Sequence, residues 1–326
     1  MLNLKNKTVL ITGGTGSFGQ SLTEYLLKYN PPNAIRIYSR DEHKQLEMST
    51  KFSKFSKKLR FLLGDVRDKE RLQRAASQVD YIVHSAALKH IASGEYNPTE
   101  VIKTNIMGSL NVIEVALDQR VKKTILISSD KACSPVSLYG ASKLCAEKLF
   151  IDANFYGGFR KTVFSVIRCG NFLGSRGSVI PIFNEQKDSE VLTITDPRST
   201  RFWVSTEDIA KFTLKCLEIA KGGEIFIPKL PSIRIIDLAK VIAPGAKHKI
   251  IGLRPAEKLH EILISEDESP YVKKTKDYYL INLLGIKEKT YNPNPSKTKR
   301  FTYASNLQNP LSLKEISKLI KKSVSF

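Results

Sequence analysis

The residues whose types and spacing are best suited to catalysis lie between Ser128 and Lys143, in the stretch SSDKACSPVSLYGASK. Tyr139 and Lys143 are four residues apart, a spacing that places two side chains on one face of a helix. A lysine ammonium stabilises a tyrosinate, so the pattern predicts that Lys143 lowers the pKa of Tyr139 and lets the phenol act as a base. Asp130 and Lys131 follow an apolar run and add two titratable groups at the carboxyl end of an expected strand. The four residues form a candidate catalytic centre.

The elements around this stretch alternate between strand and helix. Short apolar runs are expected as strands at 7–12, 34–39, 59–63, 80–84, 124–127 and 162–168, and a long helical pattern covers 98–117. This alternation predicts an α/β fold with a doubly wound parallel Rossmann sheet. We expect a dinucleotide-binding domain at residues 1–170 and a smaller mixed α/β substrate-binding domain at 171–326, partly interleaved with the first.

A glycine-rich turn, GGTGSFG, follows the first expected strand. Glycines at 13, 16 and 19 permit a tight turn and a close approach of the backbone to a pyrophosphate. The helix that follows would point its N-terminal amides at the same anion. Because the turn lies between a strand and an amphipathic helix, it predicts a dinucleotide site.

The end of the second strand indicates which dinucleotide binds. NAD sites usually carry an acidic residue there for the ribose hydroxyls, whereas this chain has Ser39 and Arg40, followed by Asp41 and Lys44. A guanidinium is suited to a 2′-phosphate, so we expect NADP. The structural alternative is an arginine at a helix start that merely pairs with Asp41.

Composition limits the classes of protein to which the chain can belong. The 326 residues are 41% hydrophobic and carry a net charge of +20. No run reaches the roughly 18 apolar residues of a membrane span, and the N-terminus lacks signal-peptide features, so we expect a cytoplasmic protein. The basic residues are dispersed and lie in no nucleic-acid motif, so we expect no nucleic-acid partner. Four cysteines without metal-ligand spacing predict reduced thiols and no metal site.

Several segments in order carry a resemblance to a known family: GGTGSFG, YSRDEHKQ, GDVRD, AALKH, SSDKA, YGASK and GSRGSVIP. The chain resembles the extended short-chain dehydrogenase/reductase family. The Asp-Lys pair of SSDKA, TRFW at 200–203 and GLRPAEKLHE at 252–261 narrow the resemblance to inverting UDP-N-acetylglucosamine 4,6-dehydratases. These enzymes begin the synthesis of pseudaminic acid-type surface or flagellin glycans. The resemblance covers roughly residues 5–265 and, patchily, FTYASN at 301–306, while Ser85 and Ala92 depart from the usual pattern.

The resemblance implies a recycled NADP, a UDP-N-acetylglucosamine substrate and a homo-oligomer, either a dimer or a hexamer. It places the cofactor at Gly13, Thr15, Gly16, Ser17, Phe18, Gly19, Ser39, Arg40, Asp41, Glu42, His43, Lys44, Asp65, Val66, Ser85, Lys89, Ser129, Tyr139, Lys143 and Phe172. It places the substrate at Lys89, Thr104, Asn171, Arg176, Gly177, Ser178, Val179, Thr195, Arg201, Arg254 and Glu257. The arginines among them suit a diphosphate, although an isolated arginine would more often form an ordinary surface ion pair.

The implied reaction assigns a role to each candidate catalytic residue. Tyr139 takes the proton of the C4 hydroxyl while hydride leaves for NADP. Lys131, with a depressed pKa, removes the proton from C5, and protonated Asp130 donates to the departing C6 hydroxyl, although the two could share these roles. Reprotonation of C5 from the opposite face gives a 4-keto-6-deoxy-L-arabino sugar.

Three alternatives to this reaction stay open. A UDP-sugar 4-epimerase shares the fold and the Tyr/Lys pair but needs no Asp-Lys pair. A retaining 4,6-dehydratase typically carries Asp-Glu where this chain has Asp130 and Lys131. A non-enzymatic NADP-sensing regulator usually lacks the tyrosine or the lysine.

Overall fold

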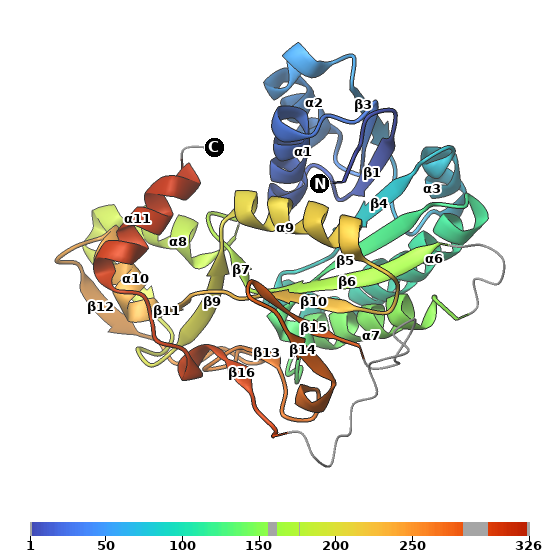
Figure 1. Ribbon diagram of the computed structural model, residues 1–326. Coiled ribbons are helices and arrows are strands. Elements are labelled where there is room, and N and C mark those ends of the chain that lie inside the picture. Colours follow the sequence, from blue (N-terminus) through green and yellow to red (C-terminus); the bar gives the residue numbers. More distant parts are fainter. Residues whose placement is uncertain (1, 156–161, 176, 283–298, 325–326) are drawn as a thin grey trace.

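The structure is a computed structural model that describes residues 2–155, 162–175, 177–282 and 299–324. A nine-stranded sheet lies at its centre, in the order β14-β15-β10-β6-β5-β4-β1-β2-β3 (Figure 1). The first six strands pair in parallel, as the strand–helix alternation predicts. They are β1 Thr8–Thr12, β2 Ala34–Ser39, β3 Leu59–Leu63, β4 Tyr81–His84, β5 Lys123–Ser129 and β6 Val163–Cys169. The doubly wound parallel sheet is therefore confirmed.

Helices connect these strands and cover the sheet. They are α1 Ser17–Tyr29, α2 Glu42–Lys51, α3 Lys69–Ala76, α4 Ile91–Tyr96, α5 Pro98–Val101, α6 Gly108–Asp118 and α7 Leu138–Asp152. The long helix expected at 98–117 is instead interrupted by a π-helical segment, Ile102–Met107, between α5 and α6. Such π-helical turns often occur at functional sites, and this one buries the side chains of Thr104 and Asn105.

Three strands from the second half of the chain extend the same sheet. Strand β10 (Ile225–Pro228) pairs in parallel with β6, and β15 (Tyr278–Ile281) and β14 (Val272–Lys274) continue antiparallel. The expected domain boundary at residue 170 stays a prediction, and any such boundary leaves these later strands in the first sheet.

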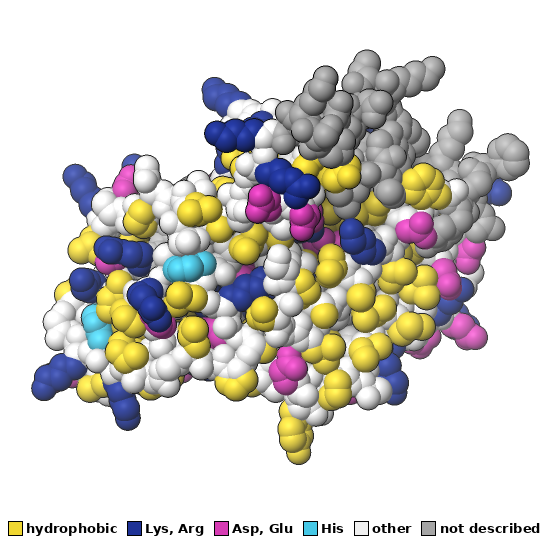
Figure 2. Space-filling model, turned by 90° about the horizontal axis from the view of Figure 1, so that it is seen from below, with side chains coloured by type: hydrophobic (Ala, Val, Ile, Leu, Met, Phe, Trp, Pro, Cys, Tyr) yellow, Lys and Arg dark blue, Asp and Glu magenta, His cyan; other side chains and the backbone are white. Residues whose placement is uncertain are grey.

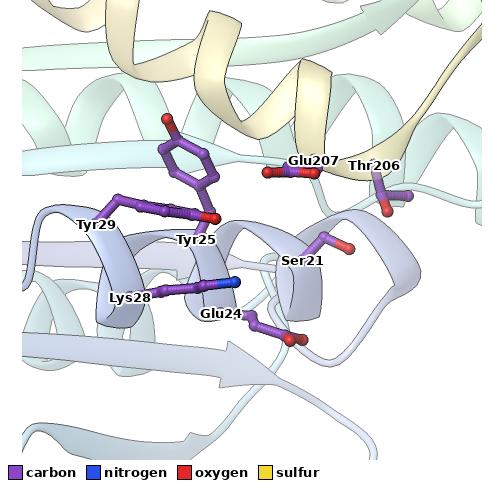
Figure 3. A pocket seen from close by; sticks show the side chains of 7 residues that line it. All are labelled: Ser21, Glu24, Tyr25, Lys28, Tyr29, Thr206 and Glu207. Atoms are coloured by element: carbon purple, nitrogen blue, oxygen red, sulfur yellow. The ribbon is translucent and has the colours of Figure 1, made fainter. Parts of the chain in front are cut away.

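Helix α9 (Thr206–Ile219) also returns to the first half of the chain, where it packs beside α1. Figure 3 shows Tyr25 and Tyr29 of α1 near Glu207 of α9 around a shallow notch. The two tyrosine rings have centroids 4.8 Å apart. This contact covers one face of the sheet with helices from both halves of the chain.

The remaining elements form a smaller lobe, seen on the left of Figure 1. Its strands are β7 Asn171–Phe172, β8 Val191–Ile194, β9 Thr200–Val204, β11 Ser232–Arg234, β12 Lys247–Ile250, β13 Ile262–Ile264 and β16 Tyr303–Ala304. Its helices are α8 Val179–Gln186, α10 Ile235–Ile242 and α11 Leu313–Val324. A separate apolar cluster that includes Phe183, Trp203 and Ile316 forms the core of this lobe.

Positive charge is dispersed over the face of the molecule that Figure 2 shows. On the face shown in Figure 2, Lys and Arg side chains are spread among hydrophobic and acidic ones. Among the described residues, no helix has both the length and the apolar character needed to cross a membrane.

A buried ion cluster joins the sheet to the helix that carries the Tyr/Lys pair. Arg168 of β6 has no exposed surface, and its guanidinium lies 2.6 Å from Glu147 of α7 and 2.8 Å from Glu268. It also donates to the carbonyl of Leu263 at 3.0 Å, and Ser128 donates to Glu147 at 2.6 Å. Because a buried charge needs such compensation, Arg168 holds three chain segments in one arrangement beneath the cleft.

We predict that replacing Arg168 by Met lowers the free energy of unfolding at neutral pH by about 3–5 kcal/mol, because two carboxylates lose their cation. Burial alone would raise the pKa of Glu268, but Arg168 outweighs burial and lowers it. A lowered folded-state pKa stabilises the fold above the unfolded-state pKa of about 4.3, and this stabilisation is lost as pH falls through the folded-state value. Urea unfolding measured from neutral to acidic pH tests both statements.

The matched control is Arg198→Met, since the Arg198 side chain is 73% exposed and its loss should leave the unfolding curve nearly unchanged. An Arg168→Met protein as stable as the wild type at neutral pH would show that the buried cluster contributes no net stability.

Candidate active site

A cleft of about 1080 Å³ runs along the carboxyl ends of the parallel strands and continues under the smaller lobe. Ligands of doubly wound sheets bind at this edge. Almost all expected cofactor residues line it: Gly13, Thr15, Gly16, Ser17, Phe18, Gly19, Ser39, Arg40, Asp41, Lys44, Asp65, Val66, Ser85, Lys89, Ser129, Tyr139, Lys143 and Phe172. The expected substrate residues that line it are Lys89, Thr104, Asn171, Gly177, Ser178, Val179, Thr195, Arg201, Arg254 and Glu257.

Among the described residues, three expected site residues do not line the cleft. Glu42 and His43 lie outside it, because the first turn of α2 exposes both side chains to solvent. Asp130 lies behind the cleft wall with no exposed surface. Arg176 lies outside the described residues, so its expected role stays a prediction.

The glycine-rich turn leaves room for a pyrophosphate. Gly13 has a φ of +66°, and a Cβ atom there would lie 2.8 Å from the backbone of Ala86. Helix α1 then begins after Gly16 without a side-chain cap. A helix N-terminus that no side chain caps can direct its amides at an anion, so these residues fit a dinucleotide.

Two basic side chains after β2, those of Arg40 and Lys44, line the cleft. Arg40 has a nitrogen 3.7 Å from Asp65 and does not form the expected alternative pair with Asp41. Asp41 instead caps α2 by accepting from the Lys44 amide at 3.0 Å, and it also pairs with the Lys44 ammonium. The hydroxyl of Ser39 accepts a hydrogen bond from Thr15 at 3.1 Å. The carboxylate of Asp41 is thus already engaged, while Ser39, Arg40 and Lys44 face the cleft.

The local fold brings the two halves of the expected catalytic centre together. The hydroxyl of Ser137 caps α7 by accepting from the amide of Gly140 at 3.1 Å. Gly140 packs so tightly on the preceding segment that a Cβ atom there would lie 2.3 Å from the Lys131 carbonyl oxygen. This close approach places Tyr139 of α7 beside the Asp130–Ala132 turn that follows β5.

The π-helical segment supports this arrangement from the other side. The Asn105 side chain accepts from the Leu88 amide at 2.8 Å and donates to the Leu88 carbonyl at 3.0 Å. It also donates to Ser142 of α7 at 2.9 Å. One side chain therefore ties the loop after β4 to the helix that carries Tyr139 and Lys143.

The pKa values of the Tyr/Lys pair differ from the sequence-based expectation. Burial raises the pKa of Tyr139 to about 12, and the Lys131 ammonium only partly opposes this rise. Burial lowers the pKa of Lys143 to about 8, and its ammonium donates to the Ile127 carbonyl at 2.7 Å. The prediction that Lys143 lowers the pKa of Tyr139 is wrong for the protein on its own, because desolvation of the phenol dominates.

Lys131 projects into the cleft and contacts three oxygen atoms. Its nitrogen lies 3.1 Å from Asp130, 3.0 Å from Glu261 and 3.3 Å from the Asn171 side-chain oxygen. Burial favours the neutral amine, but the two carboxylates outweigh it and raise the pKa of Lys131. The expected depression of that pKa is therefore wrong for the resting protein. Burial also raises the pKa of Asp130, despite its lysine neighbour.

Glu261 and Lys258 are cleft residues that the sequence analysis did not single out. Glu261 lies at the end of the segment GLRPAEKLHE, so the motif was recognised but the role of its last residue was not. The backbone of Glu261 is held from a distant segment, since its amide donates to the Ser305 hydroxyl at 3.0 Å and its carbonyl accepts from the Ser305 amide at 2.8 Å.

Arg201 lines the cleft, but its guanidinium bonds to neighbouring parts of the protein. Its guanidinium donates to the carbonyls of Thr200, Lys258 and Leu259 and pairs with Glu257 at 3.0 Å. Those bonds fix the loop of residues 257–261. The expected diphosphate contact of Arg201 stays a prediction, and Arg254 is an exposed arginine at the cleft.

The fold and the cleft define a dinucleotide-dependent enzyme of the extended short-chain dehydrogenase/reductase class. More narrowly, residues 9–283 match the family described as "Polysaccharide biosynthesis protein", and the chain belongs to that family.

Two named relatives and two solved structures are similar to this chain. A Campylobacter jejuni (strain 81-176) protein named UDP-N-acetylglucosamine 4,6-dehydratase (inverting) is 54% identical over 86% of this chain and 84% of its own length. A Rickettsia canadensis protein named UDP-glucose 4-epimerase is 41% identical over 86% and 84%. The solved structure of Pen from Bacillus thuringiensis has a TM-score of 0.91 with 37% identity over both full chains. DesIV of Streptomyces venezuelae, a dTDP-glucose 4,6-dehydratase solved with NAD, has a TM-score of 0.69 with 22% identity over 77% and 86%, a likeness of fold alone.

Proposed function

We propose that this protein is an inverting UDP-N-acetylglucosamine 4,6-dehydratase that recycles NADP. The observation that carries the proposal is the ammonium of Lys131, which lies in the cleft near Tyr139 and contacts Asp130. The relative that is 54% identical and bears this name supports the substrate and the reaction. The enzyme would work in the cytoplasm as a homo-oligomer, either a dimer or a hexamer, at the first step of pseudaminic acid-type glycan synthesis.

The cleft contains suitable groups for each part of the cofactor. The N-terminus of α1 would hold the pyrophosphate, and Ser39, Arg40 and Lys44 would hold the 2′-phosphate of NADP. When bound, the oxidised nicotinamide ring supplies a hydride acceptor and a positive charge near the phenol. A bound NADP would supply the hydride acceptor for oxidation at C4, and its reduced form would supply the hydride for C6 within the same turnover.

Tyr139 is the proposed base for the C4 hydroxyl. In the protein alone its pKa is about 12, so the phenol keeps its proton until further positive charge stabilises the phenolate. Oxidation of C4 to a ketone acidifies the hydrogen on C5 and prepares the elimination of water.

Lys131 is the proposed proton-exchanging group at C5 and C6. Its side chain is 21% exposed, whereas that of Asp130 is fully buried. Asp130 would therefore act from behind the lysine, and its raised pKa favours a carboxyl that keeps a proton for the departing hydroxyl. This arrangement modifies the direct donation from Asp130 to the sugar that the sequence suggested.

The cluster around Lys131 also separates the proposal from its alternatives. A 4-epimerase only removes and returns hydride at C4, so it has no use for proton exchange at C5, although one relative bears that name. A retaining dehydratase typically has a carboxylate where Lys131 stands. A regulator that only senses NADP needs neither Tyr139 nor Lys143, and both line the cleft. Incubation with UDP-N-acetylglucosamine and NMR of the product tests the proposal directly, since an unchanged sugar or a 4-epimer would refute it.

We predict that the protein binds NADP more tightly than NAD and that Arg40→Asp removes most of this preference. A charge-assisted hydrogen bond contributes about 1.5–3 kcal/mol, which corresponds to roughly 10- to 100-fold in the dissociation constant. Titration calorimetry with both cofactors measures the ratio. Lys57→Asp, which introduces the same charge change at an exposed position, should leave the ratio unaltered. Equal affinities of the wild type for the two cofactors would contradict the prediction.

Variants of the catalytic residues should separate oxidation from elimination. Tyr139→Phe should abolish oxidation at C4, because no base remains for the hydroxyl proton. Lys131→Ala should spare that step and slow elimination by about 10²–10⁴-fold, so that reduced cofactor accumulates on the enzyme. Rapid-mixing absorbance of the reduced nicotinamide detects the difference. Near-normal turnover of Lys131→Ala would rule out its role.

The product should have inverted configuration at C5. The groups on the two faces of the sugar differ, because Lys131 is an amine where retaining enzymes typically carry a carboxylate, and Tyr139 is a phenol. In deuterated water, early proton NMR spectra should therefore show an L-arabino ring with deuterium at C5. A D-xylo product that forms first would identify a retaining enzyme instead.

A further inference from the structure

Two carboxylates lie behind one lysine in this cleft, and the reaction as proposed so far uses only Asp130. The second is Glu261, whose side chain is 3% exposed and lies 3.0 Å from Lys131. It comes from the loop before β13, while Lys131 and Asp130 belong to the turn after β5. The fold thus brings a second acidic group from a distant part of the chain to the proton-exchanging lysine.

The contacts of Lys131 account for every proton of its ammonium group. An ammonium has three N–H donors, and three acceptors lie within 3.3 Å, on Asp130, Glu261 and Asn171. A neutral amine has only two N–H donors, so Lys131 becomes a base only if one of these protons leaves. A carboxylate that already contacts the Lys131 ammonium is the nearest acceptor for that proton.

Glu261 differs from Asp130 in its resting charge rather than in a free oxygen atom. Within the described residues, Oδ2 of Asp130 and Oε2 of Glu261 are both buried without a hydrogen-bond partner, and the nearest ion-pair partner of Glu261 Oε2 is Lys258 at 3.9 Å. Arg201 lies 3.8 Å from the other oxygen. Burial alone would raise the pKa of Glu261, but Lys131 and Arg201 outweigh it, so Glu261 rests as an anion. Burial, and to a lesser extent the Glu261 anion, raises the pKa of Asp130, so Asp130 favours keeping its own proton.

We propose that Glu261 is a positioning residue that accepts a proton from Lys131 across their 3.0 Å contact and so allows the lysine to act as the base at C5. The inference rests on the proposed function. First, a proton moves from Lys131 to Glu261. The C5–H bond then breaks, and the proton forms a new N–H bond on Lys131. The C6–O bond breaks as the hydroxyl takes a proton from the Asp130–Lys131 pair and leaves as water. Glu261 finally returns its proton to that pair.

The pH profile of Glu261→Gln tests this role. Gln can still accept a hydrogen bond from Lys131 but cannot take its proton, so the amine must form by loss of a proton to solvent. Turnover at neutral pH should fall by about 10²-fold and should rise about tenfold per pH unit. The rise should end near the pKa of Lys131, which is lower in this variant because one raising carboxylate is gone while Asp130, Arg201, Lys258 and Tyr139 remain. The wild type should show no such rise.

Two further variants keep the test decisive. Glu261→Asp retains a carboxylate and should restore much of the rate together with a flat profile, and it replaces Glu261→Gln if that variant does not fold. Glu266→Gln, an exposed neighbour on the same segment, should behave as the wild type. Thermal unfolding and binding of UDP are measured for each variant.

The outcomes separate the two claims. If the wild type does not dehydrate UDP-N-acetylglucosamine, the proposed function fails. If the wild type does so but Glu261→Gln shows full activity, or a loss that does not change with pH, the role of Glu261 as proton acceptor is refuted alone. A loss that alkaline pH reverses, with normal UDP binding, supports it.

Discussion

A lysine ammonium between two buried acidic side chains sets the electrostatics of the cleft. Lys131 keeps its proton because Asp130 and Glu261 lie 3.1 and 3.0 Å away, although burial alone would favour the neutral amine. The same ammonium opposes the rise in the pKa of Tyr139 that burial causes. Because these groups titrate together, any change at one of them alters the proton affinity of the others.

Packing and hydrogen bonds also hold the backbone around this cluster in place. Gly140 allows α7 to approach the Lys131 carbonyl, and Asn105 fastens the same helix to the loop after β4. Arg168 secures the far side of α7 through Glu147. These contacts join α7 to four other segments, so the position of the lysine depends on the whole sheet rather than on its own turn.

The sequence was sufficient to predict the six parallel strands and the glycine turn, but not that β10, β14 and β15 extend the same sheet. The six parallel strands have strong apolar runs, and the glycine turn and the Tyr/Lys spacing depend only on neighbours in the chain. The pKa values of Tyr139 and Lys131 could not be predicted in the same way, because they depend on burial and on carboxylates that arrive from elsewhere. Glu261 illustrates the limit, since nothing in GLRPAEKLHE shows that its last residue meets a turn some 130 positions earlier. The break in the helix at 102–107 was likewise hidden, because π-helical and α-helical patterns look alike over a short stretch.

The hydrogen bonds between Glu261 and Ser305 affect the order in which the site can form during translation. Ser305 bonds to both backbone groups of Glu261, and β16 pairs with β13 just beside it. The first six strands and their helices are complete by residue 169, so the core of the dinucleotide half can begin to fold while the rest is still being translated. The acidic partner of Lys131 reaches its final support only after Ser305 has left the ribosome. A chain that stalls before Ser305 can therefore have a well-formed glycine turn and Tyr/Lys pair and still lack the support that holds Glu261 beside Lys131.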